Sequence, residues 1–142
     1  MKLAARRLSL LLPAMIAISV NIGRAQLIGV LQFTVNSSFA VDNVVLPSGT
    51  YTLKQDVEDS GLFTVSDNDG KHSIYISCEN IEVSSPTPKT ELTFRKYGDT
   101  LVLKEIWIAG STTEMLVPSG PIEKKAAKLG KPTKVSVAAS TK

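Results

Sequence analysis

The single histidine and the single cysteine, His72 and Cys78, are the side chains of this sequence best suited to acid–base or nucleophilic chemistry. They lie six residues apart on one expected strand, which places their α-carbons about 20 Å apart. A nucleophile and its base must approach to about 3 Å, so the two do not form a catalytic dyad within this strand. A serine that pairs with His72 across strands stays open, although the chain carries no Gly-x-Ser-x-Gly motif.

We interpret His72 as a residue at the end of a hairpin and Cys78 as a buried apolar side chain. Because the chain has one cysteine, no internal disulfide can form, and stability must come from packing. We therefore expect no catalytic residue, and the sequence leaves the residues of any binding site unassigned.

Metal binding has little support in the sequence. Zinc sites draw on several histidines and cysteines, and this chain has one of each. The segment Asp67–Gly70 resembles the middle of a calcium loop, but Val65 and Ile76 stand where such a loop needs its first and last carboxylates. A turn explains the segment better, and neither a metal nor a cofactor is expected.

Two pairs of carboxylates, Glu58 with Asp59 and Glu79 with Glu82, are the candidates for glycoside hydrolysis. That reaction needs two acids about 5 to 9 Å apart across a cleft. Nothing in the sequence places these acids so, and carboxylates in loops and at strand edges are usually solvated. A small secreted hydrolase that uses His72 or a carboxylate pair stays open as the alternative function.

Residues 1–25 have the three parts of a secretory signal, with a basic start, an apolar stretch over Leu8–Val20 and a polar end. The small side chains of Gly23 and Ala25 predict cleavage after Ala25. The apolar stretch is about 13 residues long, short of the roughly 20 that a membrane-spanning helix needs. We expect a secreted or periplasmic protein that is not transmembrane after processing.

Removal of this signal reverses the net charge. Of the 16 basic residues four leave with the signal, so the processed chain has 12 basic against 13 acidic residues. Nucleic-acid binding, which needs a positive footprint on the folded domain, is therefore not expected. The segment 118–142 still carries six lysines and one acid. We interpret it first as a solvated segment docked on the acidic body; the alternative is that it binds an anionic envelope polymer, a membrane surface or an envelope protein.

The elements that must position these residues are short β-favouring runs, separated at intervals of about 10 residues by turn formers. Pro47 and Gly49 predict a turn, after which Tyr51 and Leu53 share one face of a strand. Hairpins are expected around Asp67–Gly70 and around the pair Gly98-Asp99. The pattern predicts an all-β fold, a small antiparallel sandwich or open barrel of about seven to eight strands with one short C-terminal helix.

The run Thr100–Ile108 is apolar on both faces, so it is expected to be a central strand, with Trp107 in the core beside Leu101 and Leu103. A helix is expected over Pro121–Leu129. Val135 to Ala139 allow one more strand, but Lys131–Lys142 otherwise suggests a loosely held basic tail. The expected organisation is a signal peptide over 1–25, a β domain over 26–117, and a basic C-terminal helix and tail over 118–142.

Three segments together resemble a family of small exported bacterial β proteins without an assigned activity: Phe39–Leu53 (FAVDNVVLPSGTYTL), Thr93–Trp107 (TFRKYGDTLVLKEIW) and the lysine-rich helix. Members of that family share a signal peptide, an LPAGTYT-like hairpin, an RYGD turn that leads to an IW strand end, and a charged C-terminal helix. Here Ser48 replaces the alanine and Lys96 separates Arg95 from the YGD turn. The resemblance implies an exported β protein and assigns no functional residue.

The sequence thus favours an exported non-catalytic binding or structural module of the bacterial envelope or exterior, with an unknown ligand. The basis is that most chemistries need residue sets that this chain lacks, whereas small β domains often serve as binding modules.

Overall fold

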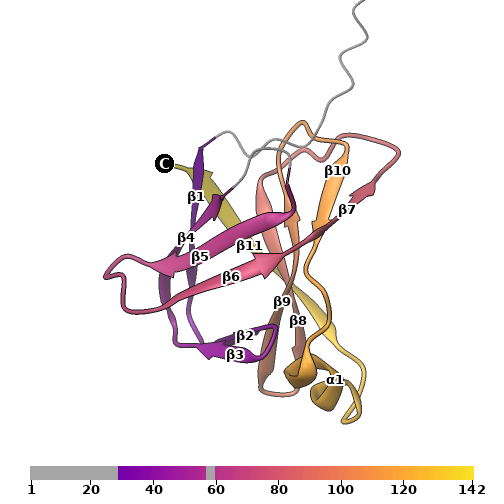
Figure 1. Cartoon of the computed structure of the whole chain (residues 1–142). Coiled ribbons are helices and arrows are strands. Elements are labelled where there is room, and N and C mark those ends of the chain that lie inside the picture. Colours follow the sequence, from indigo (N-terminus) through magenta and orange to yellow (C-terminus); the bar gives the residue numbers. More distant parts are fainter. Residues whose placement is uncertain (1–28, 57–59) are drawn as a thin grey trace, which may run out of the picture.

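The structure, a computed structural model, describes residues 29–56 and 60–142 (Figure 1). Its strands form one strongly curled, open sheet with a single short helix, which confirms the all-β prediction. The expected signal peptide of residues 1–25 lies outside the described residues. In chain order the elements are β1 (Val30–Val35), β2 (Phe39–Val41), β3 (Val44–Leu46), β4 (Gly49–Gln55), β5 (Leu62–Asp67), β6 (Ser73–Ser77), β7 (Glu79–Glu82), β8 (Glu91–Tyr97), β9 (Thr100–Trp107), β10 (Thr113–Leu116), α1 (Pro121–Ala127) and β11 (Thr133–Thr141).

The described residues hold eleven strands where the sequence indicated seven or eight. The strands without an expected counterpart are β3, β7 and β10, which are three, four and four residues long. Runs this short show little periodicity, and every residue of β7 is exposed. Their pairing partners, rather than their own residues, make them strands.

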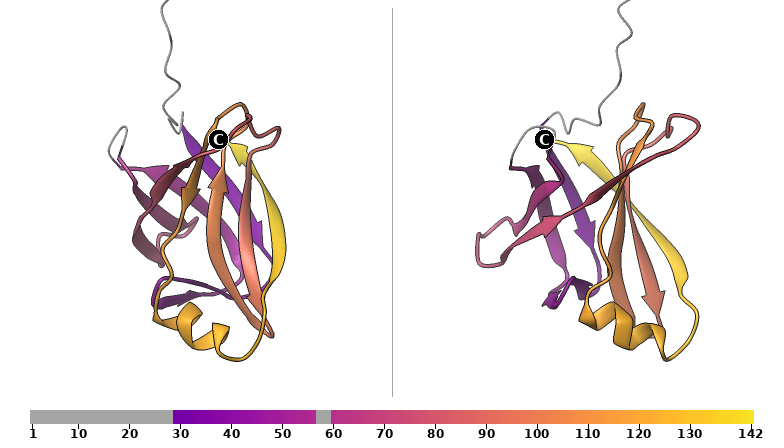
Figure 2. Two further views of the ribbon diagram at one scale, coloured as in Figure 1. Left: turned by 90° about the vertical axis from the view of Figure 1, so that its right-hand side faces the viewer. Right: turned by 45° about the vertical axis from the view of Figure 1, so that its right-hand side comes forward.

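The strands follow the order β3-β2-β9-β8-β11-β1-β4-β5-β6, and β10 pairs with both β9 and β7. Every pairing is antiparallel except the contact of β2 with β9, which joins Ala40 to Val102 in parallel. Figure 2 shows how the sheet curls, so that β1, β4, β5 and β6 face β8, β9 and β10 across the core.

The predicted turns form where the sequence placed them. Gly98 has a φ of 58°, a left-handed conformation that glycine adopts without strain, and it lets the chain reverse between β8 and β9 within two residues. In the turn between β5 and β6, the backbone N–H of Asp67 donates to the carbonyl of His72 at 3.0 Å. Both predicted hairpins are therefore confirmed.

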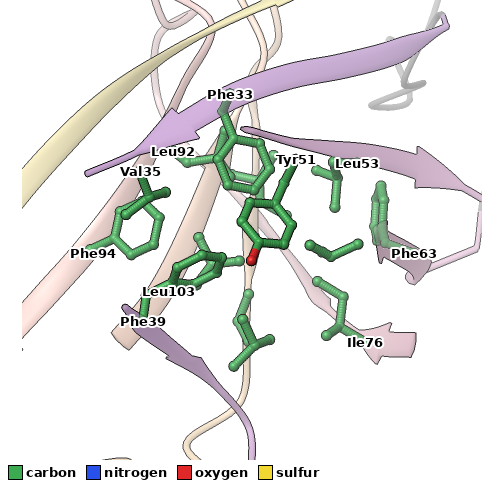
Figure 3. Packing of buried hydrophobic residues seen from close by; sticks show 14 of the residues in the cluster. Phe33, Val35, Phe39, Tyr51, Leu53, Phe63, Ile76, Leu92, Phe94 and Leu103 are labelled. Atoms are coloured by element: carbon green, nitrogen blue, oxygen red, sulfur yellow. The ribbon is translucent and has the colours of Figure 1, made fainter. Parts of the chain in front are cut away.

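Four aromatic rings fill the centre of the core, with Tyr51 in the middle of the cluster (Figure 3). The ring of Tyr51 lies 5.9 Å from that of Phe33 and 5.1 Å from that of Phe39, and Phe94 packs edge-on to Phe39 at 5.6 Å. Tyr51 and Leu53 both point inward, as the alternation of β4 predicted. Rings of this size contribute most to the burial that stabilises a core.

A β-bulge in β9 reverses which face of the sheet each side chain in the second half of the strand points to. Thr93 of β8 pairs with Glu105 and Phe94 pairs with Leu103, so Lys104 is an extra residue. Leu103 and Ile106 therefore both point into the core, three residues apart, and Trp107 turns to the outer face, where it is half-buried. The prediction of Trp107 as a core residue was wrong, because counting by twos cannot detect an inserted residue.

The last strand that Val135 to Ala139 allowed is present, whereas the loosely held tail expected for the rest of Lys131–Lys142 was wrong. Residues 133–141 form β11, which lies between β8 and β1 in the middle of the sheet (Figure 2). Val135, Val137 and Ala139 are partly buried against the core, whereas the residues between them are exposed. The C-terminal segment is thus part of the β domain rather than an appendage.

The predicted helix is confirmed as α1, with Pro121 in its first turn. Ala126 and Ile122 pack on Val102 and Tyr97 on the outer face of the sheet. A side chain on Gly120, just before the helix, would collide with Asp42, so glycine allows the chain to pass close to the β2–β3 turn. Within residues 29–56 and 60–142, no helix is long and apolar enough to span a bilayer.

Candidate functional site

Two turns that are about 20 residues apart in the sequence meet beside β4 and β5 and line an open pocket of about 400 Å³. A pocket of this volume falls within the range of small-molecule sites. The β3–β4 turn and the start of β4 supply residues 47–51. The β5–β6 turn supplies Asp67, Asn68, Asp69, Lys71 and His72. Both turns were predicted, but their approach in space was not.

His72 and Asp67 form a hydrogen-bonded pair in this pocket, with Nδ1 of His72 2.7 Å from Oδ2 of Asp67. The hydrogen bond from His72 is the main reason that the pKa of Asp67 lies below its usual value. An ionised carboxylate can only accept, so Nδ1 must carry the hydrogen, and the neutral ring presents Nε2 as an acceptor. The side chain of His72 is 45% exposed, which leaves the ring accessible to a ligand.

Backbone hydrogen bonds from His72 and Lys71 also lower the pKa of Asp67. Its second oxygen, Oδ1, is buried and accepts no hydrogen bond of good geometry among the described residues. A buried carboxylate oxygen without a donor is costly, and proteins rarely leave one unsatisfied. The phenol of Tyr51 does not serve it, because its hydroxyl donates to the carbonyl of Pro47 at 2.6 Å. Burial, and then the negative charge of Asp67, raise the pKa of Tyr51, so this hydroxyl stays protonated and holds the β3–β4 turn.

The pocket therefore offers several polar groups, and the hydrogen bond of Tyr51 to Pro47 holds one of the two turns that line it. Ser48 and Asn68 line it together with the His72–Asp67 pair, and Lys71 and Asp69 add one charge of each sign. Within the part of the chain that the structure describes, no three His, Cys, Asp or Glu side chains are grouped so that they could hold a metal ion. The arrangement suits hydrogen bonding to a small polar molecule.

The structure places the other sequence candidates as follows. His72 lies at the end of the β5–β6 hairpin and Cys78 is buried, as predicted. Burial raises the pKa of Cys78 to about 12, so its thiol is a poor nucleophile at neutral pH. Glu79 and Glu82 are exposed on β7 and, three residues apart, point to opposite faces. The pair Glu58 and Asp59 lies outside the described residues.

The sequence reading missed a buried ion pair under α1. Nζ of Lys104, in the β9 bulge, lies 3.0 Å from Oε2 of Glu123, and both side chains are at least 95% buried. Tyr97 and Arg95 also donate to Oε1 of Glu123, at 3.0 and 3.4 Å. Burial raises the pKa of Glu123, but hydrogen bonds from Lys104, Ser119 and Tyr97 outweigh it and hold the pKa below its usual value.

A signal for this pair was present in the sequence. Lys104 interrupts the apolar run of a strand expected to be central, and Glu123 is the single acid of the lysine-rich helix. A charge inside a buried strand requires a partner of opposite sign.

A second missed feature lies on the outer face, where Glu105 and Glu114 stand on neighbouring strands. Oε2 of Glu105 accepts hydrogen bonds from Thr93 at 2.6 Å and from the indole of Trp107 at 3.1 Å. Burial first, and then the charge of Glu105 and a hydrogen bond with it, raise the pKa of Glu114. Burial and the neighbouring Glu105 thus favour the protonated form of Glu114.

Comparison with protein-family models, with curated proteins and with solved structures finds no match to this chain. The resemblance to small exported bacterial β proteins stays a prediction. The features of the molecule that bear on function are the β3–β4 and β5–β6 turns and the surfaces around them.

Proposed function

We propose that this chain is an exported, non-catalytic binding module of the bacterial envelope or exterior, and that it binds a small polar ligand in the pocket between the β3–β4 and β5–β6 turns. The observation that carries the proposal is the pocket itself, about 400 Å³ in volume and lined by polar groups of two converging turns. Binding sites of small β domains commonly lie on turns that a rigid sheet positions.

The chemistry of the lining favours a ligand rich in hydroxyl or amine groups. Nε2 of His72 can form one hydrogen bond with a ligand, and Asn68 and Ser48 both donate and accept. A sugar or an amino sugar of one or two rings has the size and the hydroxyl density that this set of groups matches.

The test is a titration of the isotope-labelled processed chain with a panel of neutral sugars, amino sugars and sugar acids, followed by amide chemical shifts. We expect saturable shifts over residues 48–51 and 67–72, and a loss of affinity of about tenfold when Asn68→Ala removes one hydrogen-bonding side chain. Asn80→Ala, the same change on exposed β7, is the matched control and leaves affinity unchanged. Shifts confined to other surfaces, or none with the whole panel, would contradict the proposal.

One observation favours a second function, a small hydrolase. Ser48 lines the same pocket as the His72–Asp67 pair, and serine, histidine and aspartate are the residues of a common hydrolytic triad. In that case ester or glycoside substrates would be turned over with saturation, and both Ser48→Ala and His72→Ala would abolish turnover. Turnover of this kind would replace the non-catalytic proposal, whereas binding without turnover would exclude the hydrolase.

A further inference from the structure

A group of cations gathers at the end of the sheet that carries α1. Lys124, Lys125 and Lys128 are exposed on α1 and at its C-terminal cap. Lys131 is exposed on the chain that leads into β11, and Lys134 is exposed at the second position of β11. Exposed Lys96 joins them, because it pairs with Thr133 across β8 and β11. We call these six lysines the basic end: Lys96, Lys124, Lys125, Lys128, Lys131 and Lys134.

The fold prevents the acid of this segment from cancelling their charge. Glu123 is the one acidic residue between positions 118 and 142. Its side chain turns inward and is 3% exposed, and the ammonium of Lys104, whose side chain is 5% exposed, neutralises it at 3.0 Å. The lysines of α1 therefore face outward without a compensating carboxylate from their own helix.

An apolar side chain projects from the middle of the basic end. Leu129 is 87% exposed and lies between Lys128 and Lys131 in the sequence. The β2–β3 hairpin lies at the same end of the molecule as α1 (Figure 1), and its Val45 is 59% exposed. Large exposed apolar side chains among cations are what the interface of an anionic bilayer accommodates, since the headgroups attract the lysines and the acyl boundary receives the leucine.

We propose that the basic end is a docking surface for the anionic lipid bilayer, and that Leu129 enters its interface. Charge complementarity selects this partner, because each lysine near an anionic membrane surface strengthens binding. The apolar contact is small, so docking is reversible and sensitive to salt. The inference is independent of the turn pocket, which lies on other strands.

The position of the basic end distinguishes this membrane contact from an attachment through the residues that precede β1. In Figures 1 and 2, β1 begins at the end of the sheet opposite α1. An attachment through residues that precede β1 would bring the opposite end of the molecule to the membrane. Substitutions in the basic end can therefore tell the two modes apart.

The experiment is flotation of the processed chain, which begins at Gln26, with vesicles made of equal parts phosphatidylglycerol and phosphatidylcholine. All strands of the described residues follow this point, so the processed chain keeps the whole sheet. We expect binding in about 0.1 M salt, loss of most binding in about 1 M salt, where the Debye length falls to about 3 Å, and none with pure phosphatidylcholine.

Charge removal tests the lysines. The triple variant K124S/K125S/K128S should weaken binding about a hundredfold, since each lysine contributes about fivefold. The matched control K54S/K89S/K142S removes the same charge from exposed positions away from α1 and should bind nearly as the unmodified chain does. A third variant, with Lys→Arg at 124, 125 and 128, keeps the charge and should retain binding.

The contribution of the exposed Leu129 side chain is tested by Leu129→Ser, which should weaken vesicle binding about tenfold. Leu62→Ser on β5, which removes another exposed leucine, is the control.

Three results would overturn the proposal: equal loss in the two triple-lysine variants, equal binding to neutral vesicles, or no binding to either kind of vesicle. A soluble polyanion that binds as tightly as vesicles, with no effect of Leu129→Ser, would also overturn it and indicate a polymer instead.

Discussion

At the scale of single residues, the neighbouring carboxyls of Glu105 and Glu114 on the outer face repel each other when both are charged. Oε2 of Glu105 accepts hydrogen bonds from Thr93 and Trp107. The pKa of Glu114 is raised, first by burial and then by the charge of Glu105. A group whose pKa is higher in the folded state stabilises the fold fully at a pH below its unfolded value. That contribution is lost as the pH rises through the folded value.

We therefore expect Glu114→Gln to raise the free energy of unfolding at pH 7, by about 0.5 kcal/mol, since like charges on neighbouring strands repel by this order. Near pH 4 the variant and the unmodified chain should be equally stable, because Glu114 is then protonated. Urea unfolding at the two pH values measures the difference. Glu82→Gln on exposed β7 is the control, and an equal gain there would refute the pairing of Glu114 with Glu105.

At the scale of elements, the β9 bulge anchors α1. The extra residue in β9 is Lys104, and because it is extra its side chain can reach Glu123 beneath the helix while Glu105, its neighbour, also faces outward. Without the bulge, Lys104 and Glu105 would point to opposite faces. The ion pair and the Tyr97 hydroxyl tie α1 to two strands at once.

Lys104→Met should cost about 3 kcal/mol of unfolding free energy at neutral pH, because it leaves Glu123 buried without its main counter-charge. The pKa of Glu123 is lowered in the folded chain, so its interactions stabilise above the unfolded value and are lost as the pH falls. The penalty should therefore shrink in acid. The double variant Lys104→Met/Glu123→Leu should recover most of the loss in denaturant unfolding, and a double variant as unstable as the single one would contradict this account.

Features that depend on neighbouring residues in the chain were predicted from the sequence, and features that depend on residues far apart in the chain were not. Gly98 and the Asp67–Gly70 segment set their turns by local backbone preference, and the alternation of Tyr51 with its neighbours set the inner face of β4. The bulge at Lys104 escaped prediction because it depends on the register of the partner strand. The turn pocket escaped it because nothing local brings residues 47–51 to residues 67–72.

At the scale of the whole molecule, β11 joins the two halves of the curled sheet. Its residues 133–138 pair with β8 and residues 139–141 pair with β1. The composition, with Thr, Lys, Ser and Ala, gives a weak strand signal of its own. The neighbours on both sides decide the conformation, which is why the sequence suggested a tail.

Val137→Pro should unfold the chain or cost at least about 3 kcal/mol, because it removes a bond of the ladder with β8. The N–H of Ala139 donates to the Thr90 carbonyl, and the N–H of Val137, two residues earlier, points to the same side. Lys131→Pro, two residues before β11 begins, should leave the melting temperature nearly unchanged. Thermal unfolding followed by circular dichroism compares the two, and a Val137→Pro variant with native stability would show that this strand is dispensable.

The central place of β11 also governs when the molecule can fold. A chain emerges from the ribosome, or from an export channel, with its N-terminus first. Strand β1 then has β4 as a partner, but its other neighbour is the last strand to appear. Completion of the sheet must wait for residue 141, so one edge of β1 stays without its partner strand until the last of the described strands has emerged.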